Sequence, residues 1–140
     1  MSAPVQEAVT GVVFDTAAVV GFTRMDPYPQ AVCWTVFEHG GTIVIPSAVL
    51  AAASARVAER DRDVLAALLA LPHTVVPTLD ANTAPKIGAI LRGRTHHHPD
   101  ALIAAAHAVT HAMSRRWYVV TDRVPLLTRL DPRLLFDSLP

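Results

Sequence analysis

Three aspartates stand where their carboxylates could work together. Asp15 directly follows the apolar run 10–14, and Asp122 comes one residue after the apolar run 117–120. Asp100 begins an almost wholly apolar stretch that leads into the second run. If both runs are parallel strands, their carboxyl ends lie on the sheet edge that forms ligand crevices in α/β folds. The helix between them would bring Asp100 to the same edge, so we expect the three carboxylates to converge.

Carboxylates this close repel one another unless a cation neutralises them. Carboxylate oxygens are ligands that favour Mg²⁺ or Mn²⁺. The sequence has a single cysteine, so a cysteine zinc site is not expected. Such an ion can activate water and stabilise charge on a phosphate, which is the chemistry of phosphodiester hydrolysis. Thr16 and Thr121 flank the acids and could orient a carboxylate or hold water. Aspartate is also a common helix cap, and each aspartate taken singly is better explained as a cap.

The elements that would position these residues are short apolar runs alternating with helical stretches. Strands are expected at 10–14, 42–45, 73–77 and 117–120, with a possible fifth at 134–136. Helices are expected from 17 onward and over 30–39, 47–60, 61–71, 83–92 and 100–115. Strands without a polar face are covered on both sides, which predicts an α/β fold with a parallel sheet.

The length and composition fit one domain, which we assign to residues 1–140. An apolar content of 51% excludes intrinsic disorder, and a net charge of zero disfavours a polybasic nucleic-acid binder. The sequence has neither the basic start of a signal peptide nor an apolar run of membrane-spanning length. We therefore expect a soluble, cytoplasmic protein with no membrane contact.

Basic residues near the expected edge could contact phosphate. We select Arg94 and His98, just before Asp100, and Arg123, just after Asp122, as candidate RNA contacts. The run 96–98 of three histidines is interpreted as a solvated loop at the mouth of the crevice. These residue types are common on ordinary surfaces, so they support the site without defining it.

Other distinctive side chains are better explained by packing. His107 and His111 share one helix face, but no third zinc ligand accompanies them, so we expect a satisfied core or interface role. Cys33 is expected to be buried among apolar neighbours. The aromatic residues Trp34, Trp117 and Tyr118 are expected in the core rather than as base-stacking platforms.

Four segments resemble the sequence blocks of the PIN-domain family. The run 12–20 is similar to the opening block, a hydrophobic strand that enters Asp-Thr and a small-residue helix. The run 45–50 resembles the second block, 99–106 the third and most specific, and 119–122 with Leu126 and Leu130 the fourth. The blocks stand in family order and spacing over essentially the whole chain. They are most similar to VapC-type toxins of bacterial toxin–antitoxin pairs.

The resemblance implies a three-layer α/β/α fold with a mostly parallel sheet of four or five strands. It also implies a Mg²⁺-dependent (or Mn²⁺-dependent) endoribonuclease that hydrolyses RNA phosphodiesters, with Asp15, Asp100 and Asp122 as catalytic residues and metal ligands. The implied partners are an RNA substrate, a second copy in a homodimer and a small antitoxin, which typically places a basic side chain or a helix into the crevice.

One position departs from the family pattern. The family has a glutamate two residues beyond the position matched by Leu50, and this chain has Ala52. Glu59 lies seven residues further along the expected helix, about 10 Å away, and cannot substitute. The alternative hypothesis is therefore a catalytically degenerate PIN domain that binds protein or RNA. A flavodoxin-like or response-regulator domain is a third interpretation, disfavoured because Lys86 falls in a mid-chain helix and not near the sheet edge.

Overall fold

The computed structural model of this protein describes residues 10–93 and 98–140. Within these ranges one five-stranded sheet has the strand order β3-β2-β1-β4-β5, and every neighbouring pair is parallel. The strands are β1 (Gly11–Phe14), β2 (Thr42–Val44), β3 (Thr74–Val75), β4 (Tyr118–Thr121) and β5 (Phe136–Ser138). The predicted parallel α/β fold is confirmed.

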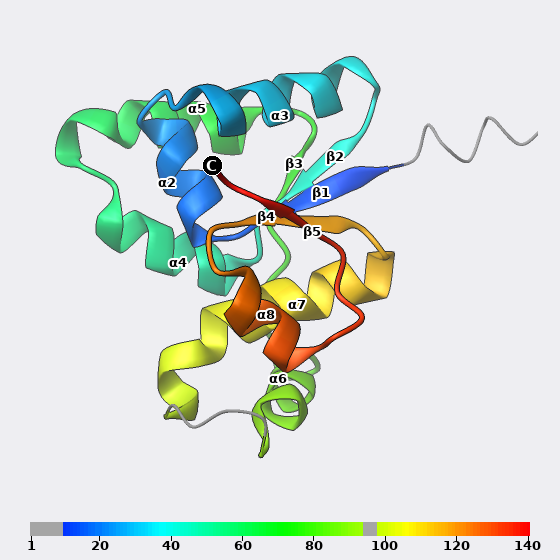
Figure 1. Ribbon diagram of the computed structural model, residues 1–140. Helices are drawn as coiled ribbons and strands as arrows, with labels where there is room; N and C mark the ends of the chain where they lie inside the picture. Colours follow the sequence, from blue (N-terminus) through cyan, green and yellow to red (C-terminus); the bar gives the residue numbers. More distant parts are fainter. Residues whose placement is uncertain (1–9, 94–97) are drawn as a thin grey trace, which may run out of the picture.

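Helices cover both faces of the sheet, as Figure 1 shows. One layer holds α2 (Thr16–Thr23), α3 (Pro27–Glu38) and α5 (Arg62–Ala70). The other holds α6 (Ala84–Leu91), α7 (Ile103–Arg115) and α8 (Val124–Leu130). The helix α4 (Ser47–Arg56) packs against both α2 and α7. Two 3₁₀ turns, η1 (Glu59–Asp61) and η2 (Pro99–Leu102), precede α5 and α7.

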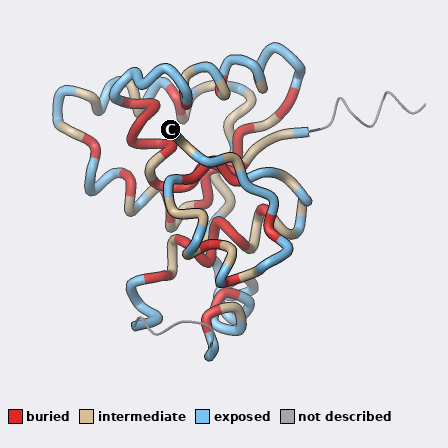
Figure 2. The backbone as a smooth tube through the Cα atoms, viewed as in Figure 1, coloured by how far each residue is buried: buried red, intermediate tan, exposed pale blue. Residues whose placement is uncertain are grey.

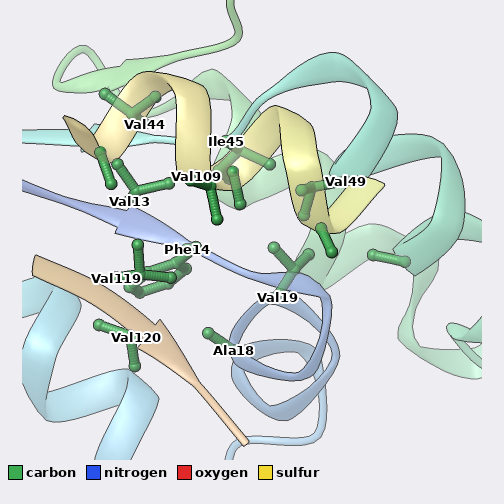
Figure 3. Packing of buried hydrophobic residues seen from close by; sticks show 14 of the residues in the cluster. Val13, Phe14, Ala18, Val19, Val44, Ile45, Val49, Val109, Val119 and Val120 are labelled. Atoms are coloured by element: carbon green, nitrogen blue, oxygen red, sulfur yellow. The ribbon is translucent and has the colours of Figure 1, made fainter. Parts of the chain in front are cut away.

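Strand β1 lies at the centre because it is apolar on both faces. Val13 is in register with Val44 of β2 and Val119 of β4, and all three are buried. Figure 3 shows these valines and Phe14 packed between the sheet strands and side chains of the covering helices, Val109 of α7 among them. Figure 2 shows the buried segments concentrated along the central strands and the inward helix faces. Burial of this apolar surface orders the strands whose carboxyl ends carry Asp15 and Thr121.

Several boundaries differ from the sequence expectations. The second helix begins earlier, at Pro27, because proline is well suited to the first turn of a helix. The expected helix 47–60 ends at Arg56 and is followed by η1, and the stretch from Asp100 starts as the turn η2. The fifth strand lies at 136–138 rather than 134–136, since Phe136 is the residue that pairs with Val119. No helix in the described ranges is long and apolar enough to cross a membrane.

Candidate active site

Asp15 lies where β1 ends and α2 begins, at the carboxyl edge of the sheet. Its backbone N–H donates to the Val120 carbonyl at 3.0 Å, which ties it to β4. Its backbone carbonyl accepts from Ala18 and Val19, but its side chain makes no capping hydrogen bond to α2. The side chain is 0% exposed. The cap interpretation therefore does not account for this carboxylate, which points elsewhere.

The Asp15 carboxylate is bound by Arg123 on both oxygens. Arg123 Nε donates to Oδ2 and Arg123 Nη2 donates to Oδ1, each at 2.8 Å. This is the bidentate geometry in which a planar guanidinium matches a carboxylate. The Arg123 side chain is 30% exposed, so the ion pair is closed to solvent on the aspartate side and partly open on the arginine side.

Thr121 links the two charged residues. Its hydroxyl donates to Asp15 Oδ2 at 2.7 Å and accepts the backbone N–H of Arg123 at 3.0 Å. Thr121 is fully buried, so both of these bonds lie in the interior. The sequence expectation that Thr121 orients a carboxylate agrees with this geometry. Thr16 is also buried beside Asp15, but its hydroxyl has no hydrogen-bond partner among the described residues.

Asp122 is exposed and faces a hollow next to this ion pair. The hollow has a volume of about 400 Å³, and its lining includes Asp122, Arg24, Arg56 and Tyr28. The Tyr28 hydroxyl donates to Asp137 Oδ1 at 2.6 Å, and that hydrogen bond raises the pKa of Tyr28. Arg24 and Arg56 were not selected from the sequence. Their signal was weak because the ends of α2 and α4 meet only in the folded chain.

Asp100 is exposed in the turn η2. Its side chain is 89% exposed, and the partner that the structure gives it is His98, with Nδ1 3.5 Å from Asp100 Oδ2. Across residues 10–93 and 98–140, no group of three or more His, Cys, Asp or Glu side chains is arranged to hold a metal ion. Among the described residues, Asp15, Asp100 and Asp122 do not form the group arranged around a metal ion that the sequence predicts.

The donor set does not fit a bound Mg²⁺ or Mn²⁺ ion. Both oxygens of Asp15 are occupied by Arg123, and the position of the family glutamate is the methyl group of Ala52 on α4. Glu59 belongs to η1 and is paired with Arg62 at 3.3 Å. Mg²⁺ is usually held by one or two carboxylates while waters complete its shell, and here the buried carboxylate is already paired with Arg123.

The basic residues expected at a phosphate-binding rim have different outcomes. Arg123 has its guanidinium committed to Asp15, which the sequence did not predict. The sequence did carry a signal for this pairing. A buried acid requires a counter-charge, and Arg123 follows β4, the strand next to the one that ends at Asp15. His98 is exposed at the start of η2. Arg94 and the first two histidines of the run 96–98 lie outside the described residues.

His107 is buried and His111 is half-buried, and each ring has one nitrogen with a hydrogen-bond partner. His107 is 0% exposed, and its Nδ1 accepts the backbone N–H of Ala48 at 3.3 Å. His111 Nδ1 lies 2.7 Å from Arg115 Nη1, and the two imidazoles have centroids 5.0 Å apart. In the described part of the chain the Nε2 atoms of both rings have no partner. Burial lowers the pKa of both histidines, that of His111 to about 4.

An apolar groove between α3 and α5 was not expected from the sequence. Trp34 and Phe37 are 42% and 44% exposed, although Trp34 was expected in the core. The groove has a volume of about 340 Å³, and it is lined by Phe22, Met25, Gln30, Trp34, Asp63, Val64, Ala67, Leu68 and Leu71. Tyr118 is likewise exposed, at 52%, because β4 begins at the opposite, open edge. Cys33 is buried as expected, and burial raises the pKa of its thiol to about 11.

Comparison with known proteins supports the fold more than the chemistry. No protein-family model matches the sequence, and no curated protein matches it. A solved chain of VapBC2 from Rickettsia felis, bound to a DNA fragment from its promoter, superposes with a TM-score of 0.66 at 18% identity. The superposition covers 94% of this chain and 100% of that one. The chain therefore has a PIN-like three-layer α/β/α fold.

Proposed function

We propose that this chain is the PIN-type half of a toxin–antitoxin pair and that it holds its protein partner in the apolar groove between α3 and α5. The observation that carries the proposal is the groove itself, where large apolar side chains gather at the surface. Met25 and Trp34, which are 61% and 42% exposed, both line the groove. Phe37 is 44% exposed, and its ring centroid lies 6.2 Å from that of Trp34. An apolar patch of this kind on a small protein is a usual mark of an interaction site. The likeness to a chain of VapBC2 supports a partner of the antitoxin kind.

The chemistry of the groove suits an amphipathic helix. Its lining is almost entirely apolar, from Phe22 and Trp34 on one side to Val64 and Leu71 on the other. Helices bind such grooves with apolar anchors spaced by three or four residues. Asp63 is the charged residue of the lining and lies in the first turn of α5. A partner helix with a basic residue opposite Asp63 would match both features.

Titration with an antitoxin-type amphipathic helix that carries a basic residue opposite Asp63 tests the proposal. We expect a stable complex that Trp34→Arg abolishes, because a charge would be forced into the apolar contact. Tyr118→Arg, at an exposed aromatic residue of β4 outside the groove, should leave the complex intact. A complex that survives Trp34→Arg would contradict the proposal. So would an isolated chain that is a homodimer split by Trp34→Arg, since the groove would then hold a second copy.

The second candidate function is the metal-dependent endoribonuclease predicted from the sequence. It is favoured by the position of Asp15 and Asp122, which directly follow β1 and β4, two neighbouring strands of the sheet. It requires Mg²⁺ or Mn²⁺ at a centre whose donors do not fit the ion in their present arrangement. The test is cleavage of single-stranded RNA with either ion. Cleavage that is lost in Asp15→Asn would establish this candidate, and equal background in both proteins would exclude it.

A further inference from the structure

We infer that the Arg123 guanidinium takes the place of a divalent cation at the acidic centre of this PIN-like fold. The chain then neutralises Asp15 with its own side chain, and the resting protein needs no metal ion there. The inference rests on the centre named in the second candidate function. It does not depend on partner binding in the groove between α3 and α5, so either idea can fail alone.

Asp15 brings a negative charge into the interior of the protein. Its carboxylate is 0% exposed at the junction of β1 and α2. An ionised carboxylate that is removed from water costs several kcal/mol unless an opposite charge and hydrogen bonds compensate it. In a metal centre the ion supplies that charge. In this protein Arg123 supplies it, with two charge-assisted hydrogen bonds.

The Asp15 carboxylate has few free positions left for accepting hydrogen bonds or binding a cation. Oδ2 accepts from Arg123 Nε and from the Thr121 hydroxyl, and Oδ1 accepts from Arg123 Nη2. A carboxylate offers about four acceptor positions, so three of them are in use. The bidentate guanidinium spans both oxygens. A cation could bind this carboxylate closely only if Arg123 turned away from it.

The backbone of Arg123 is held in position by Thr121 and by the start of α8. Its backbone N–H donates to the Thr121 hydroxyl at 3.0 Å, and α8 begins at the next residue. An arginine guanidinium remains protonated in proteins, so this counter-charge to Asp15 is permanent.

The other positions of the expected site offer a divalent ion little compensation for displacing Arg123. Ala52 offers no oxygen, and Asp100 is 89% exposed with His98 beside it. Mg²⁺ keeps several of its waters and is usually held by one or two carboxylates, so it would need Asp15 together with Asp122. Binding to Asp15 would require Arg123 to give up its ion pair and both of its hydrogen bonds to that carboxylate. The intramolecular ion pair is the more stable arrangement.

Thermal unfolding with and without millimolar MnCl₂ tests the inference. We expect the Tm of the wild type to be unchanged by Mn²⁺. Arg123→Met should lower the Tm in the absence of metal, since Asp15 loses its counter-charge, and Mn²⁺ should then raise it, because a ligand that binds the native state stabilises it. The double variant Ala52→Glu/Arg123→Met should respond more strongly. Arg62→Met, at an exposed ion pair, is the matched control and should behave as the wild type.

Two results would overturn the inference. One is a wild-type Tm that rises with Mn²⁺ and loses this response in Asp15→Asn. The other is an Arg123→Met protein that is as stable as the wild type and gains nothing from Mn²⁺. If Arg123→Met does not fold, Arg123→Lys retains a cation at the same position. That variant should fold and ignore Mn²⁺, and a Mn²⁺ response from it would count against the replacement of a metal by a side-chain charge.

Discussion

Asp15 and Arg123, which are 108 positions apart in the sequence, form a bidentate ion pair in which both hydrogen bonds measure 2.8 Å. The aspartate ends the central strand β1 and the arginine follows the adjacent strand β4, so the parallel pairing of these strands brings the two together. The pair lies at the sheet edge where the PIN-like fold would place its acidic centre. An edge that can bind ligands is here closed by the chain itself.

The ion pair should contribute strongly to stability. Asp15→Asn removes the charge that balances Arg123 and is expected to lower the free energy of unfolding by roughly 3 kcal/mol, the lower end for a broken buried pair because Arg123 is partly solvated. Urea denaturation measures the change. Glu59→Gln, at the exposed pair with Arg62, is the control and should have almost no effect. Equal effects of the two substitutions would contradict a structural role for the buried pair.

Two glycines should respond in opposite directions to alanine. A Cβ at Gly11 would lie 2.6 Å from Cζ3 of Trp117 and closer still to the Thr42 carbonyl of β2. Gly11→Ala is therefore expected to destabilise the protein by about 1–3 kcal/mol through overpacking. Gly88 lies inside α6 with nothing within 4 Å of its Cβ position. Gly88→Ala should stabilise the protein by roughly 0.5–1 kcal/mol, because alanine favours the helix. Urea midpoints of both variants decide the matter, and a shift of the same sign would be inconsistent with this packing.

The sequence was sufficient for the architecture because the signal there is local. Apolar runs such as 42–45 and 117–120 cannot be solvated on either face, which requires a covered parallel sheet, and this expectation is confirmed. The placement of Asp15 and Thr121 at the strand ends followed from the same runs.

The details of the site depended on contacts that sequence does not encode locally. Arg123 was selected as a candidate RNA contact, and its pairing with Asp15, at the end of the neighbouring strand, was not predicted. Asp100 was expected beside Asp15 and Asp122, but among the described residues these acids form no metal-holding group, and the Asp100 carboxylate is exposed in η2. Trp34 was expected in the core but is exposed. The type of an aromatic residue does not show which face of its helix is covered.

A left-handed residue after α7 offers a stabilising change. Arg116 has φ 57° and ψ 43°, a conformation that costs a side-chain residue about 1–2 kcal/mol and glycine almost nothing. Part of that gain is offset by the greater freedom of glycine in the unfolded chain, so Arg116→Gly should stabilise by about 0.5–1 kcal/mol. Arg92 ends α6 with φ −65°, and Arg92→Gly should instead destabilise. Differential scanning calorimetry compares the two, and a lower Tm for Arg116→Gly would refute the strain.

His111 should make stability depend on pH in the weakly acidic range. Burial, followed by the charges of Arg115 and His107, lowers the pKa of His111 to about 4 in the folded protein. The unfolded chain takes up that proton near pH 6.5, so stability is lost as the pH falls from about 6.5 to 4, by at most about 1.4 kcal/mol per pH unit. His107, whose pKa burial also lowers, adds to this trend.

Urea denaturation at pH 7 and pH 5 measures the effect. His111→Gln is expected to lose less stability than the wild type between these values, because the glutamine does not titrate. His39→Gln, at an exposed histidine of the α3 carboxyl end, should retain the wild-type dependence. A His111→Gln protein with an unaltered pH dependence would show that the half-buried imidazole of His111 is not its source.

The most direct test of the central claim is a crystal structure of the wild-type protein grown with MnCl₂, with diffraction collected at the manganese absorption edge. We expect Arg123 to be bidentate on Asp15 and no anomalous peak at that carboxylate. A manganese peak at Asp15, with Arg123 turned away and Asp122 or Asp100 completing the site, would contradict the replacement of a metal ion by Arg123. It would instead support the metal-dependent endoribonuclease.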